Sequence, residues 1–503
     1  MSNNQPPSAS SDASHSNLWS AFAQSVRDNV VAEVAVQVLR FGGMIVLARA
    51  LRPDDFGVFR VLLVISAFAM LVNESGIPDA LIQRKIVTDD HLDTAWWLSI
   101  TLAGFSATAL YAIAPFIAHV MGMAELTSGV RLLCIPILLE GTAVTANSRL
   151  RRALRFSALA AADVVGEAAF LIVALAMLWN GLPRWSLPAG LGARFASHAA
   201  VVWFADPRLP NGVPRVRAAR DLARFSSSVL GGRIIYVLSA NMDFILVGRL
   251  LGSTALGFYS MAWDLLRFIP DRLYKVAGRV TLPAFCRLQD DNLQLARAYR
   301  EFFGYLARIV IPLVACASIA APELIGFVYG SKWVPVAIPM RLLAPGLILM
   351  GLRVGIGSIY YTKDHPAFDI YLHSARLAMI IVVVSAMSFW GLWSVSGGMS
   401  FVEGSISIAG QWMAGWLIGV GVFTLARDAQ PGMILAALCS VATFAGKIAA
   451  AGLDVHGVLA LVMMIVPPGI VFLWREGSDV AGMIGKAFGA GSSSPIDFTE
   501  GQA

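Results

Sequence analysis

Charged residues and cysteines are scarce in this sequence, and both scarcities restrict the class of protein. Asp, Glu, Lys and Arg make up 14% of the 503 residues, whereas hydrophobic residues make up 57%. This balance leaves too few polar side chains to cover a water-soluble globule. We therefore expect an all-α integral membrane protein whose chain crosses the bilayer many times.

The cysteines also lack the spacing of a disulfide framework or a metal site. Cys134, Cys286, Cys316 and Cys439 are far apart in the chain, and none belongs to a CxxC motif or has a His at ligand spacing. Isolated cysteines in an apolar chain usually act as small space-filling side chains. We expect no disulfide bond, no zinc or other metal site, and no cofactor.

Signatures of catalysis and of secretion are lacking too. The sequence has no GxSxG, Walker A or HExxH pattern, and no loop between its apolar stretches is long enough for a catalytic domain. The first residues are Ser, Asn, Pro and Asp, in place of the basic and apolar regions of a cleaved signal peptide. We expect a non-enzymatic protein that is inserted by its first membrane span.

Apolar stretches of about 20 residues, the length that a bilayer core requires, are what the sequence has in abundance. They cover residues 27–51, 56–77, 94–121, 126–148, 156–179, 185–205, 228–251, 255–283, 300–329, 334–361, 367–390, 396–425, 431–452 and 455–474. Each stretch predicts one helix, so we expect about 14 transmembrane helices. The sixth contains Pro188 and Arg194, and its apolar signal is among the weakest.

Part of the sequence is repeated. Residues 48–59 and 248–259 match at Arg, Leu, Gly and aromatic positions, and two further matches follow in the same order. Collinear matches about 200 residues apart predict two duplicated six-helix lobes with two C-terminal helices appended. We expect a disordered tail at 1–17, an N-terminal lobe at 18–205 and a basic amphipathic linker at 206–225. A C-terminal lobe at 226–425, two appended helices at 426–475 and a mostly disordered tail at 476–503 follow.

Lys and Arg gather in every second loop of the predicted topology. Examples are residues 149–155, with four Arg, and the linker 206–225, with three Pro followed by regularly spaced Arg. Arg297, Arg300 and Arg427 lie in further loops of this kind. The positive-inside rule then places both termini in the cytoplasm. We expect the linker to lie on the headgroups of the inner leaflet and not to bind nucleic acid.

Two arginines are predicted to lie deep in the membrane. At about 1.5 Å of rise per residue, Arg40 and Arg267 each fall near the bilayer midplane, one in each lobe. An ionisable residue at that depth costs about 2.5–3.5 kcal/mol to insert, so it indicates either a wet cavity or a charged partner. Asp264 lies three residues before Arg267 on the same helix face and is one such partner.

Other polar residues share helix faces in corresponding helices of the two lobes. Glu33, Gln37 and Arg40 lie on one face of the first predicted helix. Arg233 and Asp243 share a face of the seventh. These faces predict a water-filled lumen between the lobes, and the alternative is a set of structural ion pairs.

The fifth predicted helix carries an acidic pair at i, i+4 spacing, Asp163 and Glu167. Two roles suit such a pair equally well. The carboxylates take up protons or a cation, or they neutralise an arginine of the second lobe, Arg353 or Arg376.

Six segments resemble a known family. They are 51–57 (LRPDDFG), 80–85 (ALIQRK), 243–252 (DFILVGRLLG), 256–260 (LGFYS), 282–290 (LPAFCRLQD) and 332–335 (KWVP). They are similar to segments of the Wzx-type polysaccharide exporters of the multidrug/oligosaccharidyl-lipid/polysaccharide superfamily. The resemblance implies two six-helix lobes around a central cavity and two extra helices. It also implies a flippase of the bacterial inner membrane that moves undecaprenyl-pyrophosphate-linked oligosaccharide repeat units from the cytoplasmic to the periplasmic leaflet.

The basic residues suit that substrate, because Arg offers a permanent charge and forked donors to phosphate. We predict that the headgroup is bound in a cationic lumen by Arg40, Arg267, Arg233 and Gln37. We predict that the acidic residues take part in ion coupling or in charge pairing. They are Glu33, Asp163, Glu167, Asp243 and Asp264.

The substrate and membrane lipids are the expected partners, with a polysaccharide polymerase and a chain-length regulator as further candidates. The product serves exopolysaccharide, capsule or O-antigen biosynthesis, including that of lipopolysaccharide. The alternative is a drug or small-cation antiporter of the same superfamily, for which we expect an acid-dominated cavity. A polymerase or glycosyltransferase would need a large periplasmic loop, which the sequence lacks, and a structural assembly partner would tolerate loss of the mid-membrane charges.

Overall fold

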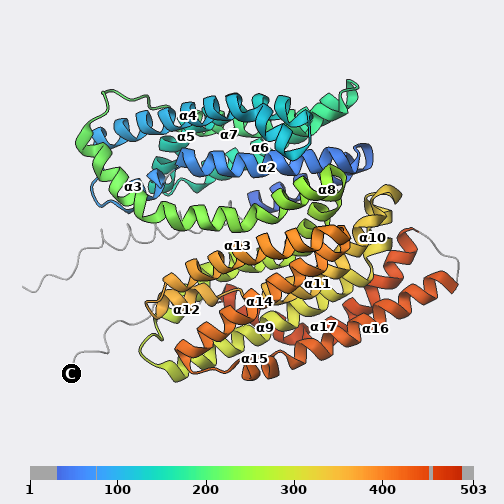
Figure 1. The fold of residues 1–503 in the computed structure, drawn as a ribbon. Coiled ribbons are helices and arrows are strands. Elements are labelled where there is room, and N and C mark those ends of the chain that lie inside the picture. Colours follow the sequence, from blue (N-terminus) through green and yellow to red (C-terminus); the bar gives the residue numbers. More distant parts are fainter. Residues whose placement is uncertain (1–30, 75, 453–456, 490–503) are drawn as a thin grey trace, which may run out of the picture. The chain divides into compact units, whose positions relative to one another are not determined.

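The computed structural model describes residues 31–74, 76–452 and 457–489, which form helices joined by turns, with no β-strand among them (Figure 1). Ten helices in these ranges are long and apolar enough to cross a membrane, or up to 11 if one bent pair counts as a span. A helix lies over the described part of every predicted apolar stretch. The all-α membrane fold is therefore confirmed, and the number of fourteen spans stays a prediction.

Six of the first seven helices begin and end close to the predicted bounds, whereas the short helix Ile77–Gln83 was not predicted. The seven are Val31–Ala50, α2 (Pro53–Glu74), α3 (Ile77–Gln83), α4 (Asp89–Met121), α5 (Glu125–Arg152), α6 (Phe156–Trp179) and α7 (Pro183–Ala205). α4 begins before residue 94, where its apolar stretch starts, because Thr88 and His91 form a capping box at its N-terminus. Polar helix ends of this kind lie outside any hydropathy window.

Most of the remaining helices are longer or more broken than predicted. The remaining helices are α8 (Val216–Cys286), α9 (Asn292–Ile319), α10 (Ala321–Val328), α11 (Ala337–Leu352), α12 (Ile356–Thr362), α13 (Ala367–Met387), α14 (Leu392–Ile418), α15 (Val422–Asp428), α16 (Gln430–Gly452) and α17 (Val458–Gly489), with two short 3-10 helices, Ser331–Val336 and Ser388–Trp390. α8 joins the seventh and eighth predicted spans across a break at Gly252. α17 continues beyond residue 476, where the C-terminal tail was expected to begin, and the tail 1–17 lies outside the described residues.

One predicted span, 396–425, is bent sharply. α14 and α15 meet at an angle of 107°. Gly419 lies between them with a φ of +73°, a backbone conformation that a residue with a Cβ adopts only with strain. The single continuous helix expected there is wrong, because an apolar pattern does not record the backbone conformation at one glycine.

The described chain forms two compact units. The first contains described residues of Met1–Met261 and Ala367–Val402, and the second those of Ala262–Pro366 and Glu403–Ala503. This division differs from the predicted lobes, since parts of the predicted second lobe pack within the first unit. The boundaries of the duplication therefore stay a prediction.

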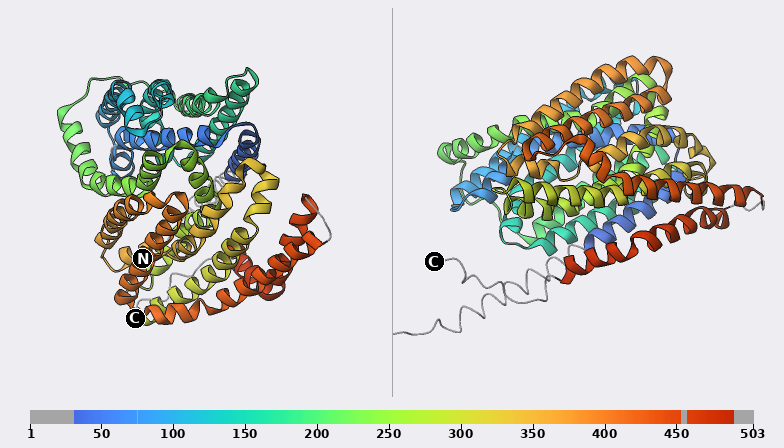
Figure 2. Two further views of the ribbon diagram at one scale, coloured as in Figure 1. Left: turned by 45° about the vertical axis from the view of Figure 1, so that its right-hand side comes forward. Right: turned by 90° about the horizontal axis from the view of Figure 1, so that it is seen from below.

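Within the first unit, α4, α5, α6 and α7 pack alongside one another (Figure 1). Their contact surfaces are rich in small side chains, and one buried cluster contains Ala143, Ala146, Ala162 and Ala199. Small residues let helix backbones approach closely, which is the main source of packing between helices in a membrane. In the second unit, α16 packs against α9 and α17, and Figure 2 shows α16 and α17 side by side.

The predicted basic linker is held against the start of α4. Arg208 binds Asp89 at 2.5 Å, and Arg215 binds Asp90 at 2.9 Å. The linker then enters α8, where Leu222 is buried in a cluster formed with α3 and α4. These ion pairs and this buried side chain fix the linker to the first unit.

Candidate substrate-binding site

A buried carboxylate and a half-exposed guanidinium form the centre of the candidate site in the first unit. Nε and Nη2 of Arg40 donate to Oε1 and Oε2 of Glu167 at 3.3 and 3.0 Å. The Glu167 side chain is only 6% exposed, whereas 44% of the Arg40 side chain remains exposed. The paired, two-point geometry is the strongest form of an ion pair between these side chains.

A second arginine contacts the same carboxylate. Nε of Arg194, in α7, lies 3.6 Å from Oε2 of Glu167. Gly166, beside Glu167 in α6, packs against the same turn of α7. A Cβ there would be in ordinary van der Waals contact with the Arg194 carbonyl oxygen, at 3.4 Å, and with the Cβ of His198, at 3.7 Å. Two guanidiniums therefore share the Glu167 carboxylate.

A histidine extends this cluster along α7. Nδ1 of His198 lies 2.8 Å from Oε1 of Glu140, in α5, and Nε2 lies 3.9 Å from Oδ1 of Asp163. We call Arg40, Glu140, Asp163, Glu167, Arg194 and His198 the α6–α7 charge cluster. Histidine is the side chain whose charge changes near neutral pH, so the net charge of this cluster depends on its protonation.

Three of the predicted residues of the first unit have partners outside the cluster. Gln37 donates to Oε1 of Glu33 at 3.2 Å, on the same face of the first helix as expected. Arg233 binds Asp79 of α3, with Nη2 and Oδ2 2.7 Å apart. Asp79, the partner of Arg233, is not among the residues that the sequence singles out.

Asp243 is fully buried and has a tyrosine as a hydrogen-bond partner. The Tyr259 hydroxyl donates to its Oδ2 at 2.9 Å, and the Tyr259 ring packs edge-on against Phe244 at 5.6 Å. A buried carboxylate bound by a tyrosine hydroxyl stabilises local packing. This contact favours the structural alternative for Asp243.

Arg267 lies in the second unit. Its Nε donates to Oδ1 of Asp271, one turn further along α8, at 2.9 Å. Asp264, the partner expected from the spacing, has an exposed side chain one turn earlier on the same helix. Arg267 therefore has a local acidic neighbour, and its side chain stays 31% exposed.

The sequence reading missed Arg194, His198 and Glu140. Arg194 and His198 are four residues apart on α7, which is not among the ten apolar spans of the described chain. The weak hydropathy of the sixth predicted stretch was the available signal. An Arg and a His among the apolar residues of a membrane helix indicate that a charged partner or water lies beside them.

The charge cluster combines two guanidiniums, three carboxylates and one titratable ring. Such a group can bind an anion through Arg40, or exchange a proton through His198 and the carboxylates. Among the described residues, no group of three or more His, Cys, Asp or Glu is placed to hold a metal ion. Together with the apolar helices of the first unit, this cluster indicates a multi-pass membrane protein with charged groups between its helices.

Comparisons with known proteins give the family. Residues 46–338 match the family described as "Polysaccharide biosynthesis protein". The teichuronic acid biosynthesis protein TuaB of Bacillus subtilis (strain 168) is 23% identical over 416 residues, 81% of this chain and 85% of TuaB. The lipopolysaccharide biosynthesis protein WzxC of Escherichia coli (strain K12) is 24% identical over 344 residues, 67% of this chain and 68% of WzxC.

The fold is similar to that of the lipid II flippase MurJ in an inward closed conformation, with a TM-score of 0.71 and 11% identity over 91% of this chain and 99% of MurJ. Since the family match covers more than half of the sequence, the chain belongs to the polysaccharide biosynthesis protein family. The resemblance to Wzx-type exporters is confirmed, and the chain is a transporter rather than an enzyme.

Proposed function

We propose that this protein is a flippase for undecaprenyl-pyrophosphate-linked oligosaccharide repeat units. It moves them from the cytoplasmic to the periplasmic leaflet of the bacterial inner membrane, for exopolysaccharide, capsule or O-antigen biosynthesis. The membership of the family and the names of the relatives support a lipid-linked saccharide as the substrate class. A pyrophosphate-sugar headgroup cannot cross hydrocarbon unaided, so the protein must offer it a polar and cationic route.

The observation that carries the proposal is the ion pair between Arg40 and Glu167. Glu167 fixes the Arg40 guanidinium in position, and the exposed part of that side chain stays available to a ligand. A pyrophosphate offers more acceptor oxygens and more charge than one carboxylate, so it can bind Arg40 while Arg194 compensates Glu167. The cluster then holds the headgroup during alternating access and releases it without leaving a buried charge unpaired.

Export of polysaccharide by Arg40 variants tests this role. We expect Arg40→Ala to abolish export with the protein inserted at normal levels, and Arg40→Lys to restore it only in part, because an ammonium lacks the forked donors. Arg52→Ala is the matched control, since Arg52 lies at a helix end with 76% of its side chain exposed. Normal export by Arg40→Ala would contradict the proposed role.

The runner-up is a drug or small-cation antiporter, favoured by the three carboxylates of the charge cluster on α5 and α6. Cells that carry the protein would then resist cationic drugs, and Glu167→Gln would remove the resistance. Polysaccharide export would be unaffected by the same change. The two functions are therefore separated by one variant and two readouts.

A further inference from the structure

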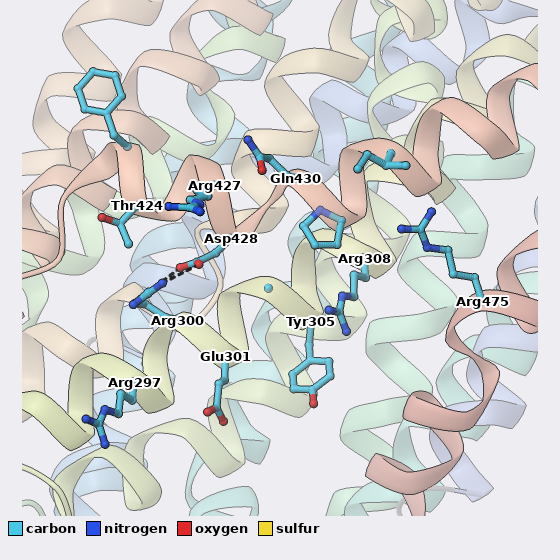
Figure 3. Close-up of a pocket in the computed structure, with 14 residues that line it drawn as sticks. Arg297, Arg300, Glu301, Tyr305, Arg308, Thr424, Arg427, Asp428, Gln430 and Arg475 are labelled. Atoms are coloured by element: carbon cyan, nitrogen blue, oxygen red, sulfur yellow. Dashed lines mark hydrogen bonds and ion pairs between the residues drawn. The ribbon is translucent and has the colours of Figure 1, made fainter.

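The second unit contains a large cationic pocket that the proposed transport does not use. It has a volume of about 950 Å³ and is lined by residues of α9, α15, α16 and α17 (Figure 3). All of its lining residues belong to the second unit. Several of them were read from the sequence only as basic residues of cytoplasmic loops.

Positive charge dominates the lining. Five arginines line the pocket, Arg297, Arg300, Arg308, Arg427 and Arg475, against two carboxylates, Glu301 and Asp428. The lining therefore carries three positive charges in excess. Such an excess in a concave site attracts anions, and the low dielectric of the surrounding helices strengthens the attraction.

One ion pair organises the pocket. Nε and Nη2 of Arg300 donate to Oδ2 and Oδ1 of Asp428 at 2.7 and 2.9 Å, which fixes the end of α15 against α9 (Figure 3). The 107° bend between α14 and α15 turns Asp428 and Arg427 toward this place. Asp428 thus neutralises Arg300 and leaves the other arginines of the lining to set the charge of the pocket.

Two of the other lining arginines share one face of α9. Arg297, Glu301, Gly304 and Arg308 are spaced by four, three and four residues, which places them on one side of the helix. α16 begins at the pocket with Gln430 and Pro431, so the positive end of a 23-residue helix also faces it. Two independent sources of positive potential therefore meet in the pocket.

Apolar side chains complete the lining. Phe423 is 93% exposed and Ile434 is 51% exposed, and both line the pocket. α9 and α16 are themselves long and apolar enough to span a membrane. A pocket with cationic walls beside exposed apolar side chains suits a molecule that carries a phosphate at one end and a hydrocarbon chain at the other.

We propose that this pocket binds the phosphate-bearing headgroup of a membrane lipid, with the hydrocarbon chain alongside Phe423 and Ile434. Two lipids share this chemistry, an anionic phospholipid such as phosphatidylglycerol and a polyprenyl diphosphate. The proposal does not depend on which substrate the protein transports. It places the lipid at α9, α15, α16 and α17, far along the chain from the α6–α7 charge cluster.

Lipid binding by the purified full chain tests the proposal. Native mass spectrometry from a neutral detergent would measure the binding of phosphatidylglycerol, of a polyprenyl diphosphate and of zwitterionic phosphatidylcholine. We expect the wild type to prefer at least one phosphate-anion lipid over phosphatidylcholine. Arg297→Gln/Arg427→Gln should weaken that binding about tenfold or more, because charge-assisted hydrogen bonds to phosphate are lost. Melting temperatures equal to that of the wild type would establish that the double variant folds. If the double variant does not fold, lipid binding is measured with Arg427→Gln alone.

A matched control removes the same charge elsewhere. Arg184→Gln/Arg287→Gln changes two exposed arginines outside the pocket and outside the basic linker, and should leave lipid binding unchanged. The lipid whose binding the pocket variant weakens is the occupant, so the two anionic lipids are distinguished in one experiment. Equal loss in the pocket and control variants, or no loss in either, would overturn the proposal.

A last arm separates a lipid from a free anion. Phe423→Ala should weaken the binding of the lipid and leave the binding of inorganic phosphate unchanged, because only the lipid has a hydrocarbon chain that contacts Phe423. If Phe423→Ala has no effect on the lipid and inorganic phosphate displaces it fully, the pocket takes a free anion and the lipid proposal is wrong.

Discussion

Gly57 and Gly257 occupy matching places in the two copies of the repeated sequence, and each lies against the other copy. A Cβ on Gly57 would lie 1.9 Å from the carbonyl oxygen of Ser253, and a Cβ on Gly257 would lie 2.0 Å from that of Pro53. The contact is reciprocal, as expected where two similar segments meet about a local two-fold axis. The repeat therefore has a structural purpose, since both copies need glycine for the same close approach.

Substitution of Gly57 should separate the two segments. Backbone atoms at such short distances cannot move aside as a flexible side chain can, so Gly57→Ala should destabilise the protein by about 1–3 kcal/mol, the usual cost of overpacking. Gly104→Ala is the control, because a Cβ on Gly104 meets nothing within 4 Å. Melting temperatures of the two variants in detergent measure the difference, and equal stability would contradict the contact.

The role of Arg267 is separable from its ion pair with Asp271. We expect Arg267→Ala to abolish export at a normal level of inserted protein. If pairing with Asp271 were the whole purpose of Arg267, replacing both residues by Met would leave export intact, because a partly exposed ion pair contributes little net stability. We expect the double variant to be inactive, and export at the level of the wild type would contradict a role in substrate binding.

Membrane topology follows from the basic loops. Reporter fusions after Arg152, Arg220 and Arg427 should report the cytoplasm, whereas fusions near Gly181 and Lys332 should report the periplasm. Both termini are then cytoplasmic. The same reporter signal from Arg220 and Lys332 would mean that the number of spans between them is wrong.

Helix positions were predictable because hydropathy over about 20 residues is a local property of the sequence. The bend at Gly419 was not predictable, because many glycines in apolar helices keep helical dihedral angles. Arg40 and Glu167 were each recognised as costly charges in a membrane, but their pairing was not. They are 127 residues apart, and their contact depends on how the helices pack.

The cationic pocket shows a second limit of sequence reading. Arg297, Arg300 and Arg427 were interpreted as topology signals, which is what isolated basic residues near helix ends usually are. Their convergence depends on the bend of α15 and on the Arg300–Asp428 ion pair. Neither feature has a local signature in the sequence.

The central claim is that the protein carries lipid-linked repeat units across the membrane, and their leaflet distribution tests it most directly. Spheroplasts from cells that lack the protein would be treated with a membrane-impermeant enzyme that removes the sugars, and the protected lipid-linked repeat units would be measured. We expect them to accumulate facing the cytoplasm, and to become accessible again when the wild type, but not Arg40→Ala/Arg267→Ala, is supplied. Repeat units that are equally accessible with and without the protein would contradict the proposed function.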